Sequence, residues 1–224
     1  MAEDEAGPRR RRKAARPQEI AAAALEVFAE RGFAAARLDD VAARAGVSKG
    51  TLYLYFPGKE ELFKAVVRET LVPHLARLEA MGMATDGPVL PLLERFLGEL
   101  GRTLATSRLG AIPKLVLAEA QNFPEIARFY ADEVIARGLG ALGRLVERGI
   151  ERGELRPVDV PATVPCIVAP LLLLALFKSS LQPFARPELL PVEAVVGAHL
   201  ELLRRGLGAH AEDGGPEDGR SGDG

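Results

Sequence analysis

The sequence has little of what disulfide-stabilised, zinc-binding or cofactor-dependent proteins need. Cys166 is the single cysteine among 224 residues, which excludes an intramolecular disulfide and a zinc site built from several cysteines and favours a reducing compartment. The histidines, His74, His199 and His210, are far apart, and no cluster of His, Asp and Glu has the spacing of metal ligands. We therefore expect no metal ion and no cofactor.

Strand patterns and membrane-targeting signals are also scarce. Val, Ile and Thr do not alternate in runs, whereas Ala, Leu, Glu and Arg dominate, which favours helices. We interpret the amino-terminal sequence as lacking a signal peptide. Residues 160–177 form an uncharged run of nearly membrane length, but Pro161, Pro165 and Pro170 interrupt it. We expect a cytoplasmic all-α protein that does not enter a membrane, with this run buried in a core or a dimer interface.

Residues arranged for catalysis are not apparent either. Asp39-Asp40 and Glu60-Glu61 are adjacent pairs, and adjacent residues on a helix point to different faces. The segment Gly138-Leu-Gly-Ala-Leu-Gly143 matches G-x-G-x-x-G, but a helical pattern precedes it, whereas a dinucleotide site needs a strand there. We expect no enzyme activity and interpret these glycines as positions where helices pack closely.

Charge is unevenly distributed along a chain whose net charge is only −2. Between Arg9 and Lys59, eleven basic residues stand against five acidic ones, whereas residues 208–224 hold five acids and one arginine. This distribution is expected when only one end of a protein meets an anionic polymer. We interpret residues 1–16 as a flexible basic arm and residues 208–224 as a disordered acidic tail.

Helical periodicity divides the remainder into a small head and a larger body. The first helix is expected to begin at Arg16-Pro17 and to end at Gly32. A connecting helix starts at Lys59, and Pro73 kinks or ends it. The other helices are expected at about 38–45, 49–55, 88–107, 111–122, 124–152, 162–182 and 191–207. We assign residues 17–63 to the head, including the start of the connecting helix, and residues 64–207 to the body.

The segment Leu38–Phe56 has the features of two helices that cross at a tight turn. Gly46 lies at the turn, where a left-handed backbone is easiest without a Cβ, and the Ser48 hydroxyl is placed to cap the second helix. That helix is too short to be stable alone, which leaves its outer face for a partner. The apolar residues of the seam are Val41, Ala45, Val47, Leu52 and Tyr55. A helix-turn-helix of this kind lays its second helix in the major groove of DNA.

The head also resembles the TetR/AcrR family of repressors. The resemblance covers about residues 17–63 and rests on Gly32-Phe33, Val41-Ala42, Ala45–Tyr53, Tyr55-Phe56 and Lys59–Leu62. The rest of the chain is similar in its helix pattern, and the segment Glu119–Glu125 is similar to AcrR-like members. The resemblance implies an all-α homodimer with an N-terminal three-helix DNA-binding head and a larger C-terminal body for ligand binding and dimerisation.

Carried over by position, the resemblance implies a set of DNA contacts. Hydroxyl, ammonium and backbone N–H groups at the start of the recognition helix are expected to meet phosphates or base edges. These groups belong to Ser48, Lys49, Gly50 and Thr51. Tyr53 is expected to contact DNA and Tyr55 to lie partly in the core, while Lys59 is expected to reach a backbone phosphate.

Two departures from the family pattern bear on these contacts. Leu54 replaces a polar or aromatic residue, so in the groove it touches a thymine methyl group and forms no hydrogen bond. Ala36-Arg37 replaces the usual Thr or Ser, so the helix cap is lost, and Arg37 becomes a candidate phosphate contact. The Arg9–Arg12 run either follows the DNA or remains a solvated tail that aids steering.

The amphipathic helices between residues 88 and 152 are expected to enclose an apolar pocket, as the resemblance implies. Candidates for its wall are Phe96, Leu100, Leu104, Leu117, Gln121, Phe123, Phe129, Tyr130 and Phe177. Gln121 and Tyr130 are the candidates that can orient a ligand by hydrogen bonds. For each candidate the alternative is an ordinary core position. The helices at about 162–182 and 191–207 are expected to pair with those of a second subunit.

The sequence thus predicts a sequence-specific DNA-binding transcriptional regulator. We expect a repressor that leaves its double-stranded DNA operator when a small apolar ligand favours a head spacing that no longer matches successive major grooves, about 34–36 Å apart. Two alternatives stay open at this point. One is a constitutive or activating DNA binder of the same fold without a ligand, and the other is an α-helical protein-interaction module that does not bind DNA.

Overall fold

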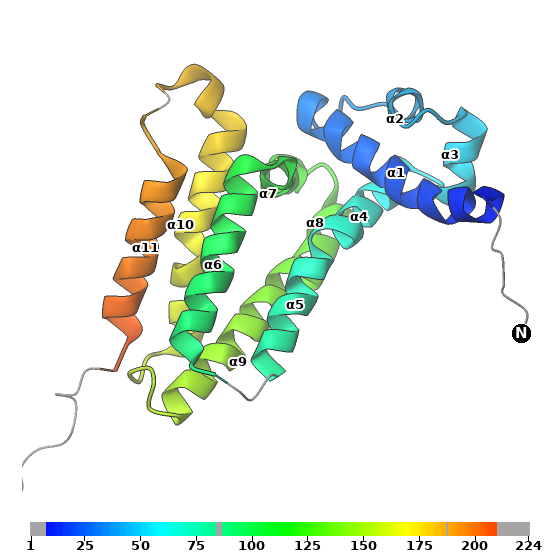
Figure 1. Ribbon diagram of the computed structural model, residues 1–224. Coiled ribbons are helices and arrows are strands. Elements are labelled where there is room, and N and C mark those ends of the chain that lie inside the picture. The colour runs from blue at the N-terminus through cyan, green and yellow to red at the C-terminus, as the bar shows by residue number, and fades with distance from the viewer. Residues whose placement is uncertain (1–7, 84–86, 187, 210–224) are drawn as a thin grey trace, which may run out of the picture.

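A computed structural model describes residues 8–83, 87–186 and 188–209. The described residues form helices and no strand, which confirms the expected all-α class. Figure 1 shows a small head of α1 to α3 at one end of a larger helical body, with α4 running from the head into the body. The head and the body were both expected from the sequence.

The head is built on one long helix crossed by two short ones. Its elements are α1 (Pro8–Arg31), α2 (Leu38–Arg44) and α3 (Lys49–Tyr55), followed by α4 (Lys59–Thr70). Gly32 and Gly46 end α1 and α2 with positive φ angles of 78° and 64°, as their positions predicted. Arg44 of α2 forms ion pairs of 2.8 Å with both Glu26 and Glu30 of α1.

The first helix begins earlier than expected. Its backbone is helical from Pro8, so residues 8–16 of the predicted flexible arm continue α1. The physical reason is that Arg, Lys and Ala all favour helix, and a helix that has already formed extends with one hydrogen bond per added residue. The remainder of the predicted arm, residues 1–7, and residues 210–224 of the predicted tail lie outside the described residues.

The body consists of antiparallel helices, with short irregular turns between some of them. Its elements are α5 (Val72–Met83), α6 (Val89–Thr106), the 3₁₀ turn η1 (Arg108–Gly110), α7 (Ala111–Glu119), α8 (Pro124–Tyr130), the π-helical segment η2 (Ala131–Ala136), α9 (Arg137–Glu151), α10 (Val160–Ser180), the 3₁₀ turn η3 (Gln182–Phe184) and α11 (Val192–Leu207). The helix expected over residues 124–152 is therefore one rod with a π-helical segment inside it.

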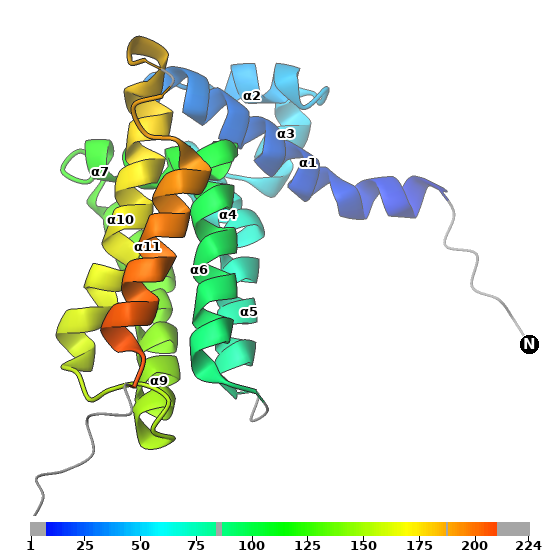
Figure 2. The same ribbon diagram turned by 60° about the vertical axis from the view of Figure 1, so that its left-hand side comes forward.

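Two hydrophobic cores divide the buried side chains. One core joins α1 to α4 with α7 and α8, so it is shared by the head and the near end of the body. The other fills the body between α5, α6, α9, α10 and α11. Figure 2 shows α6, α10 and α11 side by side in the body, away from the recognition helix α3.

Helix α10 contains the long uncharged run. Among the described helices it alone is long and apolar enough to cross a membrane by length and composition, and 33% of its most apolar stretch is buried. It packs against α6, α7 and α9, and its buried residues include Ile167 and Leu171. Leu172 and Leu173 are exposed apolar side chains on its outward side.

Two glycines offer a matched test of backbone strain. An alanine Cβ at Gly46 meets nothing within 4 Å, so Gly46→Ala costs only the strain of its positive φ. We expect a loss of about 1 kcal/mol in the free energy of unfolding, measured by urea denaturation. Gly140→Ala is the control, because Gly140 is an exposed helical position within the G-x-G-x-x-G match and should gain about 0.5–1 kcal/mol. Equal changes in the free energy of unfolding for Gly46→Ala and Gly140→Ala would contradict the assignment of backbone strain to Gly46.

Candidate functional site

The recognition helix α3 is capped as the sequence predicted. The Ser48 hydroxyl accepts a hydrogen bond from the Thr51 backbone N–H at 3.1 Å and lies 2.8 Å from the Thr51 hydroxyl. Leu52 is fully buried against the head and anchors the inner side of the helix. The cap and this anchor hold a helix of seven residues that is too short to persist alone.

The outer face of α3 is open to solvent. Lys49, Gly50, Tyr53 and Leu54 share this face by helical spacing and are all exposed, Tyr53 by 45% and Leu54 by 76%. A Cβ at Gly50 would meet only the Ser48 hydroxyl oxygen at 4.0 Å, so packing does not require glycine there. Tyr55 is half-buried and packs against the head core, in the position expected for it.

The start of α2 contributes charge to the same surface. Lys49 forms an ion pair with Asp39 at 2.9 Å, and their hydrogen bond raises the pKa of Lys49 and lowers the pKa of Asp39. Both side chains are about half exposed or more, so the pair is weak and Lys49 can exchange Asp39 for another anion. Arg37 is exposed and forms no side-chain cap on α2, which confirms the expected loss of the usual cap.

Lys59 lies differently from the expected phosphate contact. Its ammonium donates hydrogen bonds to the carbonyl oxygens of Ala34 at 2.8 Å and Ala36 at 3.2 Å, and it lies 4.7 Å from the centre of the Phe33 ring. Burial lowers the pKa of Lys59. The carbonyl groups of the loop between α1 and α2 thus accept the hydrogen bonds of the Lys59 ammonium at the start of α4. Lys59 links this loop to α4 instead of reaching outward.

Beside the shared core, a group of four side chains joins the head to the body, and we call it the head–body contact: Phe33, Lys59, Glu119 and Phe123. The Phe33 and Phe123 rings meet edge to face with centroids 4.8 Å apart, and Lys59 lies 6.0 Å from the Phe123 ring centre. A Glu119 carboxylate oxygen accepts a hydrogen bond from the Ala34 N–H at 3.2 Å. Phe123 was expected in the pocket wall and lies here instead.

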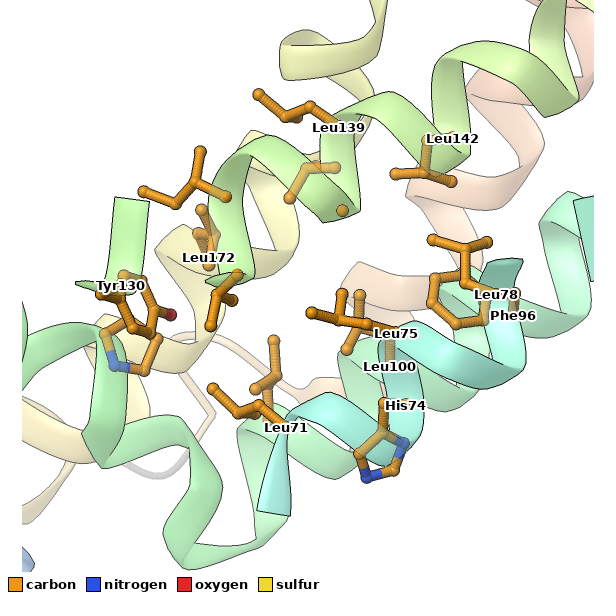
Figure 3. A pocket seen from close by; sticks show the side chains of 16 residues that line it. Leu71, His74, Leu75, Leu78, Phe96, Leu100, Tyr130, Leu139, Leu142 and Leu172 are labelled. Carbon is orange, nitrogen blue, oxygen red and sulfur yellow. The ribbon is translucent and has the colours of Figure 1, made fainter. Parts of the chain in front are cut away.

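The body contains an apolar cavity of about 130 Å³ that is partly open to solvent. Of the predicted wall residues, Phe96, Leu100, Leu104 and Tyr130 line it, and Figure 3 shows Phe96, Leu100 and Tyr130 among the lining side chains. The other lining residues were not predicted from the sequence as wall residues; they are Leu71, His74, Leu75, Leu78, Pro113, Val134, Ile135, Gly138, Leu139, Leu142, Val168 and Leu172. Apolar residues at helical spacing mark the inner face of a helix, but spacing does not tell a cavity wall from a packed core.

The remaining residues predicted for the wall do not line this cavity in the structure. Leu117 is 68% exposed on α7, and Gln121 is exposed in the turn that follows it, so neither reaches the cavity. The Phe129 ring packs on the Arg68 guanidinium at 4.9 Å, and Phe177 is half-buried outside the lining. Of the two residues expected to orient a ligand, Tyr130 lines the cavity and Gln121 does not.

The outward faces of α10 and α11 carry exposed apolar side chains. Leu173 of α10 is 64% exposed and Leu202 of α11 is 69% exposed. Small residues are exposed beside them at helical spacing, such as Ala169 on α10 and Ala198 on α11. This surface belongs to the two helices on which a dimer interface was expected.

Comparison with known proteins identifies both parts of the chain. Residues 20–66 match the family model described as bacterial regulatory proteins, tetR family, and residues 92–185 match a tetracyclin repressor-like C-terminal domain. The HTH-type transcriptional regulator RutR of Escherichia coli is 30% identical over 210 residues, which cover 87% of this chain and 84% of RutR.

Solved structures share the fold and hold different ligands. FadR of Bacillus subtilis, in complex with stearoyl-CoA, is 25% identical with a TM-score of 0.64, over 83% of this chain and 96% of FadR. The complex of SmeT, from Stenotrophomonas maltophilia, with triclosan is 21% identical with a TM-score of 0.71, over 88% of this chain and 93% of SmeT.

Proposed function

Because this chain belongs to the TetR family of bacterial regulatory proteins, we propose that it is a repressor that a small, largely apolar ligand releases from its DNA operator. Members of this family are DNA-binding transcriptional regulators. Family membership therefore argues against the alternative of a protein-interaction module that does not bind DNA. The observation that carries the proposal is the pairing of an exposed, capped recognition helix with an apolar cavity in one chain. We expect the protein to act in the cytoplasm and not as an enzyme.

The outer face of α3 supports docking in a major groove. Lys49 supplies a cation, Tyr53 a ring with a hydroxyl group, and Leu54 an apolar side chain for a thymine methyl group. Gly50 leaves the backbone at the start of α3 open to a phosphate, because no side chain covers it. Ser48 and Thr51 bond each other in the cap, so their hydroxyls reach DNA only along their free sides.

The exposed faces of α10 and α11 support a homodimer. Two copies that bury Leu173 and Leu202 against each other remove an apolar surface from water, and four such helices form a closed seam. A twofold dimer presents two recognition helices to successive major grooves of one operator.

The head–body contact supports a route from the cavity to DNA. Tyr130 lines the cavity at the C-terminal end of α8, and Phe123 precedes the first residue of the same helix. A helix of seven residues spans only about 10 Å and moves as one piece. In the proposed mechanism, a ligand beside Tyr130 shifts α8, Phe123 shifts against Phe33, and the population moves toward a head spacing that fits the operator poorly.

DNA binding is tested on the α3 face. We expect Lys49→Ala combined with Tyr53→Ala to weaken binding to DNA from upstream of the gene by about tenfold or more, and to lower the slope of affinity against salt by about 1, because one phosphate contact is lost. Fluorescence anisotropy over a salt series measures both quantities. Arg77→Ala on α5 is the control for loss of one positive charge and should change neither. Wild-type protein that shows no salt-sensitive binding would exclude the DNA function.

The dimer is tested with two equally exposed leucines. Leu173→Glu places a charge on the proposed interface, and we expect monomers at micromolar concentration because an unpaired charge is costly to bury. Leu117→Glu, at a leucine of similar exposure on α7, should leave the dimer intact. Analytical ultracentrifugation measures both. A dimer that survives the first change but not the second would place the interface elsewhere.

The coupling route is tested at Phe123. Phe123→Ala removes the edge-to-face contact with Phe33, and we expect any compound that releases the wild-type DNA complex to release this variant several-fold less effectively. Phe184→Ala, at a side chain that is 90% exposed on η3, is the matched control. Anisotropy gives the release, and calorimetry confirms that the compound still binds. Undiminished release in Phe123→Ala would remove this contact from the mechanism.

A further inference from the structure

The wall of the cavity consists almost entirely of apolar side chains. Among the described residues that line it, only His74 and Tyr130 have polar side-chain atoms, and none has a carboxylate. The His74 ring lies at the edge of the group of side chains in Figure 3. A charged molecule entering this space would lose its hydration and find no opposite charge, which costs several kcal/mol.

Tyr130 is the polar group that faces the interior. Its side chain is 7% exposed, and its hydroxyl forms no hydrogen bond with any residue in the described part of the chain. Figure 3 shows the hydroxyl turned toward the space between the leucines. Burial raises the pKa of Tyr130, so the group stays neutral and can both donate and accept a hydrogen bond. A buried hydroxyl with no protein partner is poised to bond to a ligand.

The backbone explains why Tyr130 shares this wall with residues three turns further along. The π-helical segment η2 follows Tyr130 directly and holds more residues per turn than an α-helix. The wider turns let Val134, Gly138 and Leu142 face the same space as Tyr130. Gly138 keeps that space open, since a Cβ there would lie 3.3 Å from Leu75.

We propose that the cavity takes an uncharged, largely apolar molecule with about one ring and one oxygen that hydrogen-bonds to the Tyr130 hydroxyl, and that it excludes organic cations and carboxylates of similar size. The volume of about 130 Å³ is close to that of engineered apolar cavities, about 150 Å³, that bind benzene. This ligand class rests on the proposed ligand-responsive function and names the chemistry of its effector.

Four single-ring probes of similar size test the proposal by isothermal titration calorimetry on the full chain. They are acetophenone, ethylbenzene, phenylacetate and phenyltrimethylammonium. We expect acetophenone to bind about three- to tenfold more tightly than ethylbenzene, which is the effect of one neutral hydrogen bond. We expect both ions to bind at least about tenfold more weakly than acetophenone.

Two variants test whether the probes bind in the cavity and whether the Tyr130 hydroxyl causes the preference for acetophenone. Tyr130→Phe removes only the hydroxyl, which has no partner to lose among the described residues, so the fold is kept and the preference for acetophenone over ethylbenzene should disappear. Val168→Phe, on the α10 side of the wall, fills the space and should abolish binding of both neutral probes. Thermal unfolding confirms that each variant is folded, and Leu100→Phe replaces Val168→Phe if the latter is not.

Several results would overturn the proposal. They are an ion that binds within threefold of acetophenone, a preference for acetophenone that survives Tyr130→Phe, neutral binding that survives a filled cavity, and no neutral binding to folded protein. Operator binding is measured on the same preparations. The expected probe pattern without any operator binding supports the ligand class and contradicts the repressor function, so the two failures are distinguishable.

Discussion

Helices α2 and α3 have seven residues each and cannot persist in water without support from other elements. That support is the hydrophobic core of the head, which includes an aromatic cluster in which the ring centroids of Phe28, Phe33 and Phe63 lie 5.4 to 5.9 Å apart. Phe123 of the body joins the cluster from outside the head, at 4.8 Å from Phe33. The core beneath the surface proposed to read DNA therefore includes a side chain of the body, which ties the position of the head to the body.

The head was largely predictable because its signals are local. Gly46 has the left-handed backbone that a turn between two helices requires, and Ser48 caps the helix that follows it, three residues before its partner Thr51. Such features depend on residues a few positions apart and are visible in sequence. Lys59 was misjudged because its partners, the carbonyls of Ala34 and Ala36, are more than twenty residues away in the chain. A sequence pattern cannot indicate that the partners of a lysine are backbone carbonyl groups, because every residue has one.

The cavity was less predictable, because its wall is assembled from six helices, α5 to α10, and from η2. Phe96, Leu100 and Leu104 follow one another at four-residue spacing on α6 and so share one helix face. A sequence pattern that predicts one of them in the wall therefore predicts all three. Leu117 and Phe129 satisfy equally good helical spacing, yet one faces solvent and the other packs on Arg68. Periodicity defines a face of a helix, but the neighbouring elements decide whether that face meets a cavity, a core or water. The π-helical segment adds a change of register that the sequence does not signal.

Helix α10 links sensing to assembly in the proposed mechanism. Leu172 lines the cavity and is 36% exposed, and the adjacent Leu173 is 64% exposed on the proposed dimer face. Ile135, also a lining residue, is 48% exposed, so the cavity meets solvent near these two positions. A ligand that pushes on Leu172 therefore acts beside the dimer seam, while the same ligand at Tyr130 acts through α8 on the head. Because the spacing of two heads depends on both the seam and the head–body contact, one bound molecule can change that spacing from two directions without touching DNA.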